Sequence, residues 1–486
     1  MRRLTWMLLP LLAAPACLKL DRATDTADAS DVEGTGDAAP GDTTADVEAS
    51  GDTGGAIDGS GADTTTDAGP TLDESDPVDE AGNYVVRDCS TVGATTRPYV
   101  PQTCQHEVAR LMGTVDRVMS CGAGSDTPKA IRLNYPTEDA SRTLAFMWTS
   151  GKDNRSTLVQ LGTSPDNLDR TYWGYSFTYS GLVNRRQHEV HVCDLEPGRT
   201  YHYRVGGEGG WSEIHTFSTA PAPGTEGAEV VFGVVGDTRS STYEAWGQAI
   251  RQIRDAGADF VLFSGDAVEV GPVQAQWDLW FEQASPALAD LPYVPCNGNH
   301  DQVVLQYFAQ FALPRDERNY AVRYGDMAIV SMTDTPIDEI IEIGGSYRAF
   351  MDDAYTRLSD ARWKVLLNHR PFYSASTRHG SAEDLQAEWL PVVDEHRVDI
   401  VFNGHDHNYE RSRPVRGGEV VAPGAGTLFV VAAGVGAPLY DNGADWWTEK
   451  SEKVENYLLV RATRDTMQVT AYRLDGTVLD EFSLQK

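Results

Sequence analysis

The chain of 486 residues is long enough for two or three domains, and its formal net charge at pH 7 is −32. The charge is unevenly spread, because residues 21–80 hold 18 Asp or Glu against one basic residue, Arg22. An acidic chain of this kind argues against nucleic acid as a partner, since that binding depends on Lys and Arg that neutralise phosphates.

Residues 1–16 have the pattern of a signal peptide. The basic start Met1-Arg2-Arg3 precedes a short apolar run, and Ala14-Pro15-Ala16 fits a small-x-small cleavage site. The apolar run is well below the roughly 20 residues that a membrane span needs. Cys17 follows the cleavage site directly and resembles a bacterial lipoprotein box, although Ala14 stands where Leu is usual. We expect an exported protein of the cell envelope with a lipid anchor on Cys17; the alternative is a secreted or periplasmic protein.

Residues 17–80 are expected to form an acidic, disordered tether. They are mostly Asp, Ala, Thr, Gly and Ser and contain no aromatic residue. Such a composition cannot bury enough apolar surface to offset the entropy lost on ordering. Residues 81–125 follow as a cysteine-containing segment with weak core signals.

Beyond Cys17 the chain has five cysteines, and an exported protein permits disulfides. An odd number leaves at least one of them unpaired within the monomer. Cys89, Cys104 and Cys121 lie close together in the sequence, which predicts one bridge among them; Cys193 has no assigned partner. Cys296 lies in an apolar run and is predicted to be a buried free thiol.

Residues 126–222 alternate in the manner of short β-strands. Two sets of alternate residues each share a face: Leu144, Phe146 and Trp148, and Tyr201, Tyr203 and Val205. The segment 195–201, Leu-Glu-Pro-Gly-Arg-Thr-Tyr, looks like the tyrosine corner of immunoglobulin-like sandwiches. An all-β sandwich is therefore predicted. Three histidines fall within its strands and are expected to be packing or surface residues: His188, His191 and His202.

A linker at residues 221–224 separates this region from residues 228–486, where strands alternate with amphipathic helices. Two helical stripes are apolar: Trp246, Ile250 and Ile253, and Trp277, Trp280, Phe281, Ala284 and Leu288. Strands return at residues 428–432, 457–461 and 467–473. This order predicts an α/β domain.

Five apolar runs in the α/β region end in Asp, Asn or His. Residues 230–235 precede Asp237, 260–263 precede Asp266, 293–296 precede Asn299, 365–367 precede His369, and 400–403 precede His405 and His407. In α/β proteins, ligand sites lie outside the carboxyl ends of parallel strands. Imidazole suits zinc, iron and manganese. Together the five runs predict one metal centre.

These residues also carry a family resemblance. The order GD, GD, GNHD, H and GHxH resembles the calcineurin-like metallophosphoesterases. Residues 365–374 and 404–412 look like the purple acid phosphatase branch, and residues 131–135 and 217–221 resemble its fibronectin type III-like N-terminal domain. The resemblance implies a fibronectin-like sandwich followed by an α/β metallophosphoesterase domain with two mixed sheets flanked by helices.

The resemblance further implies two metal ions, of Fe, Mn or Zn, that share Asp266. The implied ligands are Asp237, Asp266 and His407 for the first ion, and Asp266, Asn299, His369 and His405 for the second. His300 would face the phosphate without binding metal, as a hydrogen-bond donor or general acid. Asp301 would orient His300.

Two departures from the family pattern concern the first metal. Glu269 stands where the purple branch has a tyrosine, and Arg239 stands where other members have a histidine. Glu269 is a candidate replacement ligand. Arg239 cannot ligate, because a guanidinium stays protonated, and either meets a phosphate oxygen or pairs with Glu269.

Arg378 and His379 are candidate substrate-facing residues. His379 matches the spacing of a substrate-facing histidine in the plant enzymes, while Arg378 replaces a second histidine of theirs. An arginine there could hold a phosphate through two hydrogen bonds. The alternative is a mobile surface loop.

The expected function is that of an exported dinuclear metal-dependent phosphatase, an acid phosphatase-like hydrolase of phosphomonoesters. One alternative is a phosphodiesterase, because the ligand set is shared. Another is a surface binding protein in which the sandwich works beside a degraded metal site. The partner would be a phosphate-ester substrate, with membrane contact only through the lipid anchor.

Overall fold

The structure is a computed structural model that describes residues 103–104, 116–119, 126–179, 184–207, 210–334 and 343–486. The predicted signal peptide, the tether, Cys17, Cys89 and Cys121 lie outside these residues. None of the helices within the described ranges is long and apolar enough to cross a membrane.

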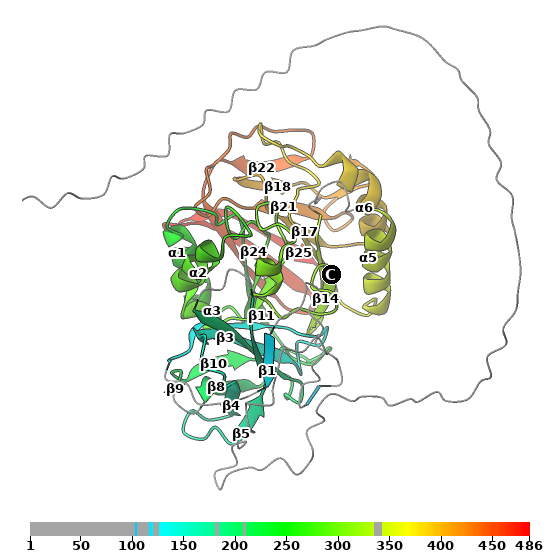
Figure 1. The fold of residues 1–486 in the computed structure, drawn as a ribbon. Helices are drawn as coiled ribbons and strands as arrows, with labels where there is room; N and C mark the ends of the chain where they lie inside the picture. Colours follow the sequence, from blue (N-terminus) through cyan, green and yellow to red (C-terminus); the bar gives the residue numbers. More distant parts are fainter. Residues whose placement is uncertain (1–102, 105–115, 120–125, 180–183, 208–209, 335–342) are drawn as a thin grey trace, which may run out of the picture. The chain divides into compact units, whose positions relative to one another are not determined.

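The first part of the described chain is a sandwich of two antiparallel sheets (Figure 1). One sheet has the order β1 (Asp116–Met119), β6 (Tyr175–Thr178), β7 (Arg185–Val192), β3 (Leu144–Gly151) and β2 (Lys129–Asn134). The other has the order β10 (His215–Ser218), β8 (Thr200–Gly207), β4 (Leu158–Gly162) and β5 (Arg170–Trp173), with β9 (Gly210–Trp211) beside β8. The ring of Phe146 lies 4.8 Å from Tyr203 and 5.6 Å from Phe217 of the opposite sheet. The predicted all-β region is confirmed.

The tyrosine corner is also present. The hydroxyl of Tyr201 accepts a hydrogen bond from the backbone N–H of Glu196 at 2.9 Å, which is the bond that defines this motif. His188 is fully buried between Ser150 and Thr157 and stacks on Trp148. His188 therefore belongs to the packing of the sandwich.

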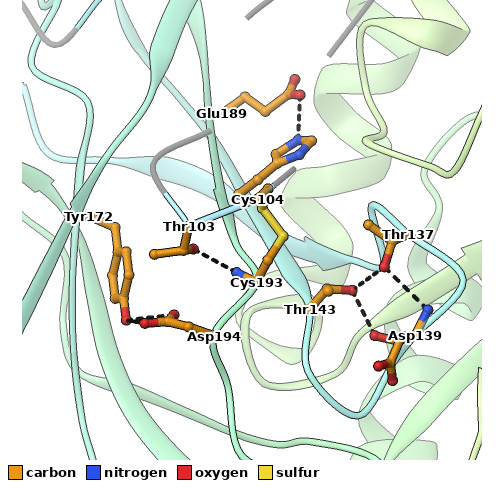
Figure 2. Close-up of a disulfide and its surroundings, with 10 residues drawn as sticks. Thr103, Cys104, Thr137, Asp139, Thr143, Tyr172, Glu189, Cys193 and Asp194 are labelled. Carbon is orange, nitrogen blue, oxygen red and sulfur yellow. Dashed lines mark hydrogen bonds and ion pairs between the residues drawn. A yellow bond between two sulfur atoms is a disulfide. The ribbon is translucent and has the colours of Figure 1, made fainter. Parts of the chain in front are cut away.

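The disulfide joins Cys104 to Cys193 (Figure 2). The sequence prediction of a bridge among Cys89, Cys104 and Cys121 is therefore wrong for Cys104. Cys193 directly follows strand β7, and its N–H donates to the Thr103 hydroxyl at 2.9 Å. The fold places that strand end beside the distant Cys104, which proximity in the sequence does not reveal. Cys296 is a buried free thiol, as predicted.

Two mixed sheets form the α/β region. The six-stranded sheet has the order β13 (Tyr293–Pro295), β12 (Phe260–Phe263), β11 (Val230–Val235), β23 (Asn456–Ala462), β24 (Thr466–Arg473) and β25 (Val478–Gln485). The seven-stranded sheet has the order β14 (Tyr320–Tyr324), β15 (Met327–Met332), β16 (Trp363–Asn368), β17 (Ile400–Asn403), β21 (Leu428–Ala432), β18 (Tyr409–Ser412) and β22 (Thr448–Glu452). Strands β19 (Val415–Arg416) and β20 (Glu419–Val420) form a small hairpin.

Helices flank the two sheets on opposite sides (Figure 1). Helices α1 (Glu244–Asp255) and α2 (Gln274–Ala284) lie beside the six-stranded sheet, and α5 (Gly345–Arg357) and α6 (Glu383–Glu395) beside the seven-stranded one. Helix α3 (Ala287–Asp290) packs on α1 and on strands β2 and β10 of the sandwich, and α4 (Leu305–Phe308) is a single turn. Alternate residues of strand β16 pack on opposite faces of its sheet. Leu366 packs in the core under α5 and α6, and Val365 packs in the core shared with the six-stranded sheet. Leu288 lies in α3 and not in a continuation of α2, because Pro286 has no N–H to extend the helix.

The five predicted ligand-bearing runs are strands β11, β12, β13, β16 and β17. β11, β12 and β13 pair in parallel in one sheet, and β16 and β17 pair in parallel in the other. All are almost entirely buried, as parallel strands covered on both faces must be. The carboxyl ends of strands from two sheets therefore supply the candidate site.

The sandwich contacts one of these strands directly. The side chain of Asn134, at the end of β2, donates to the backbone carbonyl of Tyr293 in β13 at 2.8 Å. The Ser331 hydroxyl donates to Pro295 of the same strand at 2.9 Å. Strand β13 is the edge of its sheet, where backbone groups lack strand partners. The sandwich thus helps to fix the strand that leads to Asn299.

Candidate metal centre

Three residues at the strand ends have left-handed backbone conformations. The φ angles are 53° at Asp237, 56° at Asp266 and 69° at His405. Positive φ is uncommon for residues other than glycine and costs free energy, so such residues gather at functional sites. In each case the chain turns sharply after its strand and brings the side chain into a common space.

The predicted second metal position is a compact set of four side chains. The Asn299 Oδ1 atom lies 3.1 Å from His369 Nε2 and 3.0 Å from His405 Nδ1. His369 Nε2 is also 3.4 Å from Asp266 Oδ1 and 3.3 Å from His405 Nδ1. Four donor atoms at these separations can surround one ion.

The predicted first position has three side chains. Ligand atoms of Asp237, Asp266 and His407 all lie within 4.8 Å of one another, and all three residues are buried. His407 Nε2 lies 3.4 Å from Asp237 Oδ1. Both oxygens of Asp237 also accept the backbone N–H of His405 at 3.0 Å, so the carboxylate ties the two positions together.

Backbone carbonyls orient two of the imidazoles. His369 donates Nδ1–H to Ser264 at 2.7 Å, and His407 donates Nδ1–H to Pro438 at 2.6 Å. A metal-ligating histidine ordinarily uses its other ring nitrogen in this way, which fixes the tautomer. The Nε2 atoms of both rings face the site.

The electrostatics of the site favour a bound cation. Burial lowers the pKa of His369, but Asp266 and other carboxylates outweigh it and raise this pKa to about 10. Burial also raises the pKa of Asp266, yet His369 brings it well below its usual range. Burial and the neighbouring His369 lower the pKa of His405 to about 2, which keeps its imidazole in the neutral form that ligates metal. The donor set of carboxylate, amide and imidazole therefore fits two ions of the Fe, Mn or Zn kind.

His300 lies next to Asn299 and is partly exposed. Its Nδ1–H donates to the backbone carbonyl of Glu269 at 2.8 Å, so Nε2 is left for a substrate. The expected contact with Asp301 is not what orients the ring. The Asp301 carboxylate instead accepts four backbone N–H bonds, from Asp266, Ala267, Val268 and Gly298.

Arg239 and Glu269 pair with each other. Arg239 Nη1 lies 2.8 Å from Glu269 Oε2, and Nη2 donates to the Tyr440 hydroxyl at 3.2 Å. Burial would lower the pKa of Arg239, but Glu269 and Asp266 raise it, so the guanidinium stays charged. Of the two predicted roles for Glu269, the observed contact is the ion pair.

Comparison with known families agrees with this geometry. Residues 128–219 match the purple acid phosphatase N-terminal domain, and residues 230–409 match the calcineurin-like phosphoesterase domain. The chain belongs to the calcineurin-like phosphoesterases of the purple acid phosphatase type. It is accordingly a hydrolase, and its family uses a dinuclear metal centre.

Relatives support the same assignment, and a solved structure has the same fold. The chain is 26% identical to purple acid phosphatase 18 of Arabidopsis thaliana over 61% of this chain and 68% of that protein. It is 28% identical to human acid phosphatase type 7 over 61% of this chain and 73% of that protein. A purple acid phosphatase from yellow lupin seeds has the same fold, with a TM-score of 0.64, 20% identity and 74% of each chain covered.

In this phosphoesterase two loops outside the strand ends also approach the metal centre. Arg378 and His379 are both exposed, and the ring of His379 lies 4.2 Å from that of His405. Tyr440 stacks on His407 at 4.2 Å. The sequence reading placed His379 as a candidate and missed Tyr440, whose segment has no periodic pattern or motif that would have marked it.

Proposed function

We propose that this phosphoesterase is an exported, dinuclear hydrolase of phosphomonoesters. The observation that carries the proposal is the convergence of Asp266, Asn299, His369 and His405 around one position, with Asp237 and His407 beside it. These residues would hold a pair of metal ions, which would supply the Lewis acidity for activating water and neutralising phosphoryl oxygens.

The chain's own residues then serve the substrate. His300 donates Nδ1–H to the Glu269 carbonyl, so its protonated form carries an Nε2–H that can donate a hydrogen bond to a phosphoryl oxygen or protonate the leaving group. The neutral Asn299 amide adds no negative charge to the site. Asp301 acts as a positioning residue that holds the backbone of the loops carrying Asp266 and Asn299.

The preference for monoesters rests on the polar groups around the site. Arg239, His300 and His379 approach the metal positions from three separate segments. A terminal phosphate presents three unesterified oxygens to such groups, while a diester replaces one of them with a second carbon substituent. The names of the relatives, which are acid phosphatases, are consistent with the proposal.

Initial rates on an aryl phosphate and on the corresponding bis-aryl phosphate test this function. We expect kcat/KM to be higher for the monoester, and both rates to be lost on treatment with a strong chelator. A higher value for the diester would replace the proposal with a phosphodiesterase. A protein that binds metal but hydrolyses neither ester would instead fit the surface binding alternative.

Export and lipid attachment are part of the proposal. They are supported by the pattern of residues 1–17 and by the disulfide between Cys104 and Cys193, because disulfides persist in oxidising compartments. Metabolic labelling with palmitate and cell fractionation test it. The wild type should be labelled and sediment with membranes, and Cys17→Ala should lose the label. An unlabelled wild type in the soluble exported fraction would indicate simple secretion.

A further inference from the structure

The guanidinium of Arg239 lies against the ligands of the first metal position. Its Nε atom is 3.6 Å from Asp266 Oδ2, and its Nη2 atom is 3.5 Å from His407 Nε2. The Nε–H is buried and has no hydrogen-bond partner among the described residues. The positive charge of Arg239 therefore lies next to the ligands of a position that must also bind a metal cation.

Two contacts hold this guanidinium in place. Glu269 pairs with Nη1, and the Tyr440 hydroxyl accepts from Nη2 while its ring stacks on His407. The side chain of Arg239 is only 11% exposed, so it has little freedom to move away into solvent. The ion pair also keeps the Glu269 carboxylate on the arginine and away from a metal.

The two metal positions consequently differ in donors and in charge. The second has four converging side chains. The first has three side chains and a cation 3.5 Å from one of its ligand atoms. Fewer donors and a like charge both lower the affinity for a cation, most strongly in a buried site.

We propose that Arg239 makes the first position a weak, reversible metal site, so that the protein retains one ion at the second position and takes the other from solution. The inference rests on the proposed function only through the assignment of the metal ligands. In this arrangement the guanidinium supplies part of the positive charge at the first position whenever the first ion has dissociated.

Metal binding, measured without substrate, tests the proposal. The protein is loaded with Mn²⁺, dialysed against a weak chelator and analysed for metal, and the dissociation constants are then obtained by equilibrium dialysis. The wild type should retain one equivalent per chain and bind a second one weakly. Arg239→Met should bind that second equivalent at least about tenfold more tightly, because a like charge within about 4 Å is removed.

Arg378→Met is the matched control, since it removes the same charge from an exposed arginine of the same region. In Arg378→Met the dissociation constant of the second Mn²⁺ equivalent should change by no more than about twofold, because exposed charges are screened. Arg239→Lys should keep the weak binding, and Arg239→His, which adds an imidazole donor, should bind tightest. Melting curves show whether each variant is folded. If Arg239→Met does not fold, the inference is tested by comparing metal binding of Arg239→Lys and Arg239→His.

Two outcomes would overturn the inference: a wild type that retains two equivalents with similar dissociation constants, or an Arg239→Met variant that behaves like Arg378→Met. Either result leaves the proposed function intact. A protein that binds no Mn²⁺, Zn²⁺ or iron at either position would defeat the proposed function itself.

Discussion

The two metal positions of this phosphoesterase are both formed at the ends of parallel strands, and they differ in the residues around them. In both, buried parallel strands end in sharp turns that present Asp, Asn or His. At the second position four donor atoms lie 3.0–3.4 Å from their neighbours. At the first position, the guanidinium of Arg239 lies within 3.6 Å of Asp266 and 3.5 Å of His407. The fold thus provides two places for metal, and residues next to the turns decide how firmly each is held.

The largest effect is expected from breaking the second position. His405→Ala removes one of its four donors, so the ion that is otherwise retained should be lost. The turnover should fall by about 1,000-fold, the upper range for removing one electrostatic stabiliser of the transition state. Metal content after dialysis and initial rates on an aryl phosphate measure both effects.

His407→Ala is the matched variant at the first position. It should keep the ion at the second position, and the dissociation constant of the ion at the first position should rise further. If His407→Ala loses the retained ion and His405→Ala does not, the order of the two positions is reversed.

A smaller effect should follow from His300→Ala, which leaves both positions intact. In the proposed function its imidazole serves the substrate and not the ions, so the variant should bind metal like the wild type. The rate should fall by about 100-fold, a typical contribution of a positioned acid–base group. Unchanged turnover would exclude a role in the reaction, and loss of metal would make His300 part of the second position.

Glu410 allows the loop above the second position to be tested by pH. This glutamate of β18 is buried and accepts hydrogen bonds from Ser374 and from the backbone of Ala375, in the segment that leads to His379. Burial raises its pKa to about 7, only partly offset by these bonds. Its contribution to stability is therefore full below the unfolded pKa near 4.5 and is lost as the pH rises to about 7.

The expected loss in free energy of unfolding over that window is about 3 kcal/mol. Glu410→Gln, which stays neutral, should remove this part of the pH dependence. Urea unfolding between pH 4.5 and 7.5 measures it. Equal slopes for the two proteins would show that Glu410 does not change its protonation on folding.

The smallest effect concerns colour. Glu269 has no phenol, so the iron-loaded wild type should be colourless or faint. Glu269→Gln should lose first-position metal if Glu269 is a ligand and should not lose it if the ion pair with Arg239 is its role. Glu269→Tyr places a phenol there, and a weak visible charge-transfer band with iron is expected. An intense band in the wild type would mean that another tyrosine reaches the metal, and Tyr440, which stacks on His407, is the candidate.

The parts of the site that follow local sequence rules could be predicted. Strands β11 and β12 begin and end at the residues that their apolar runs predict, and Asp237 and Asp266 follow them in the expected turns. The contacts that could not be predicted join distant segments. Examples are the Cys104–Cys193 disulfide and the stacking of Tyr440 on His407, which depend on how strands and loops meet in space.

Residue type alone also left two roles undecided. Glu269 could have ligated metal or paired with Arg239, and only the positions of both side chains distinguish the two. The family resemblance implied that Asp301 would orient the His300 imidazole. Its carboxylate instead accepts hydrogen bonds from backbone N–H groups, and the sequence does not show which backbone groups lie within reach.

The four backbone N–H bonds accepted by Asp301 have a consequence for how the enzyme acquires its metal. They hold the turn after β12 and the turn after β13 together through protein atoms alone. The loss of entropy on ordering these turns therefore belongs to folding and not to metal uptake. Ions should exchange without local unfolding, and added metal should raise the melting temperature only through mass action, in proportion to its affinity for the folded chain.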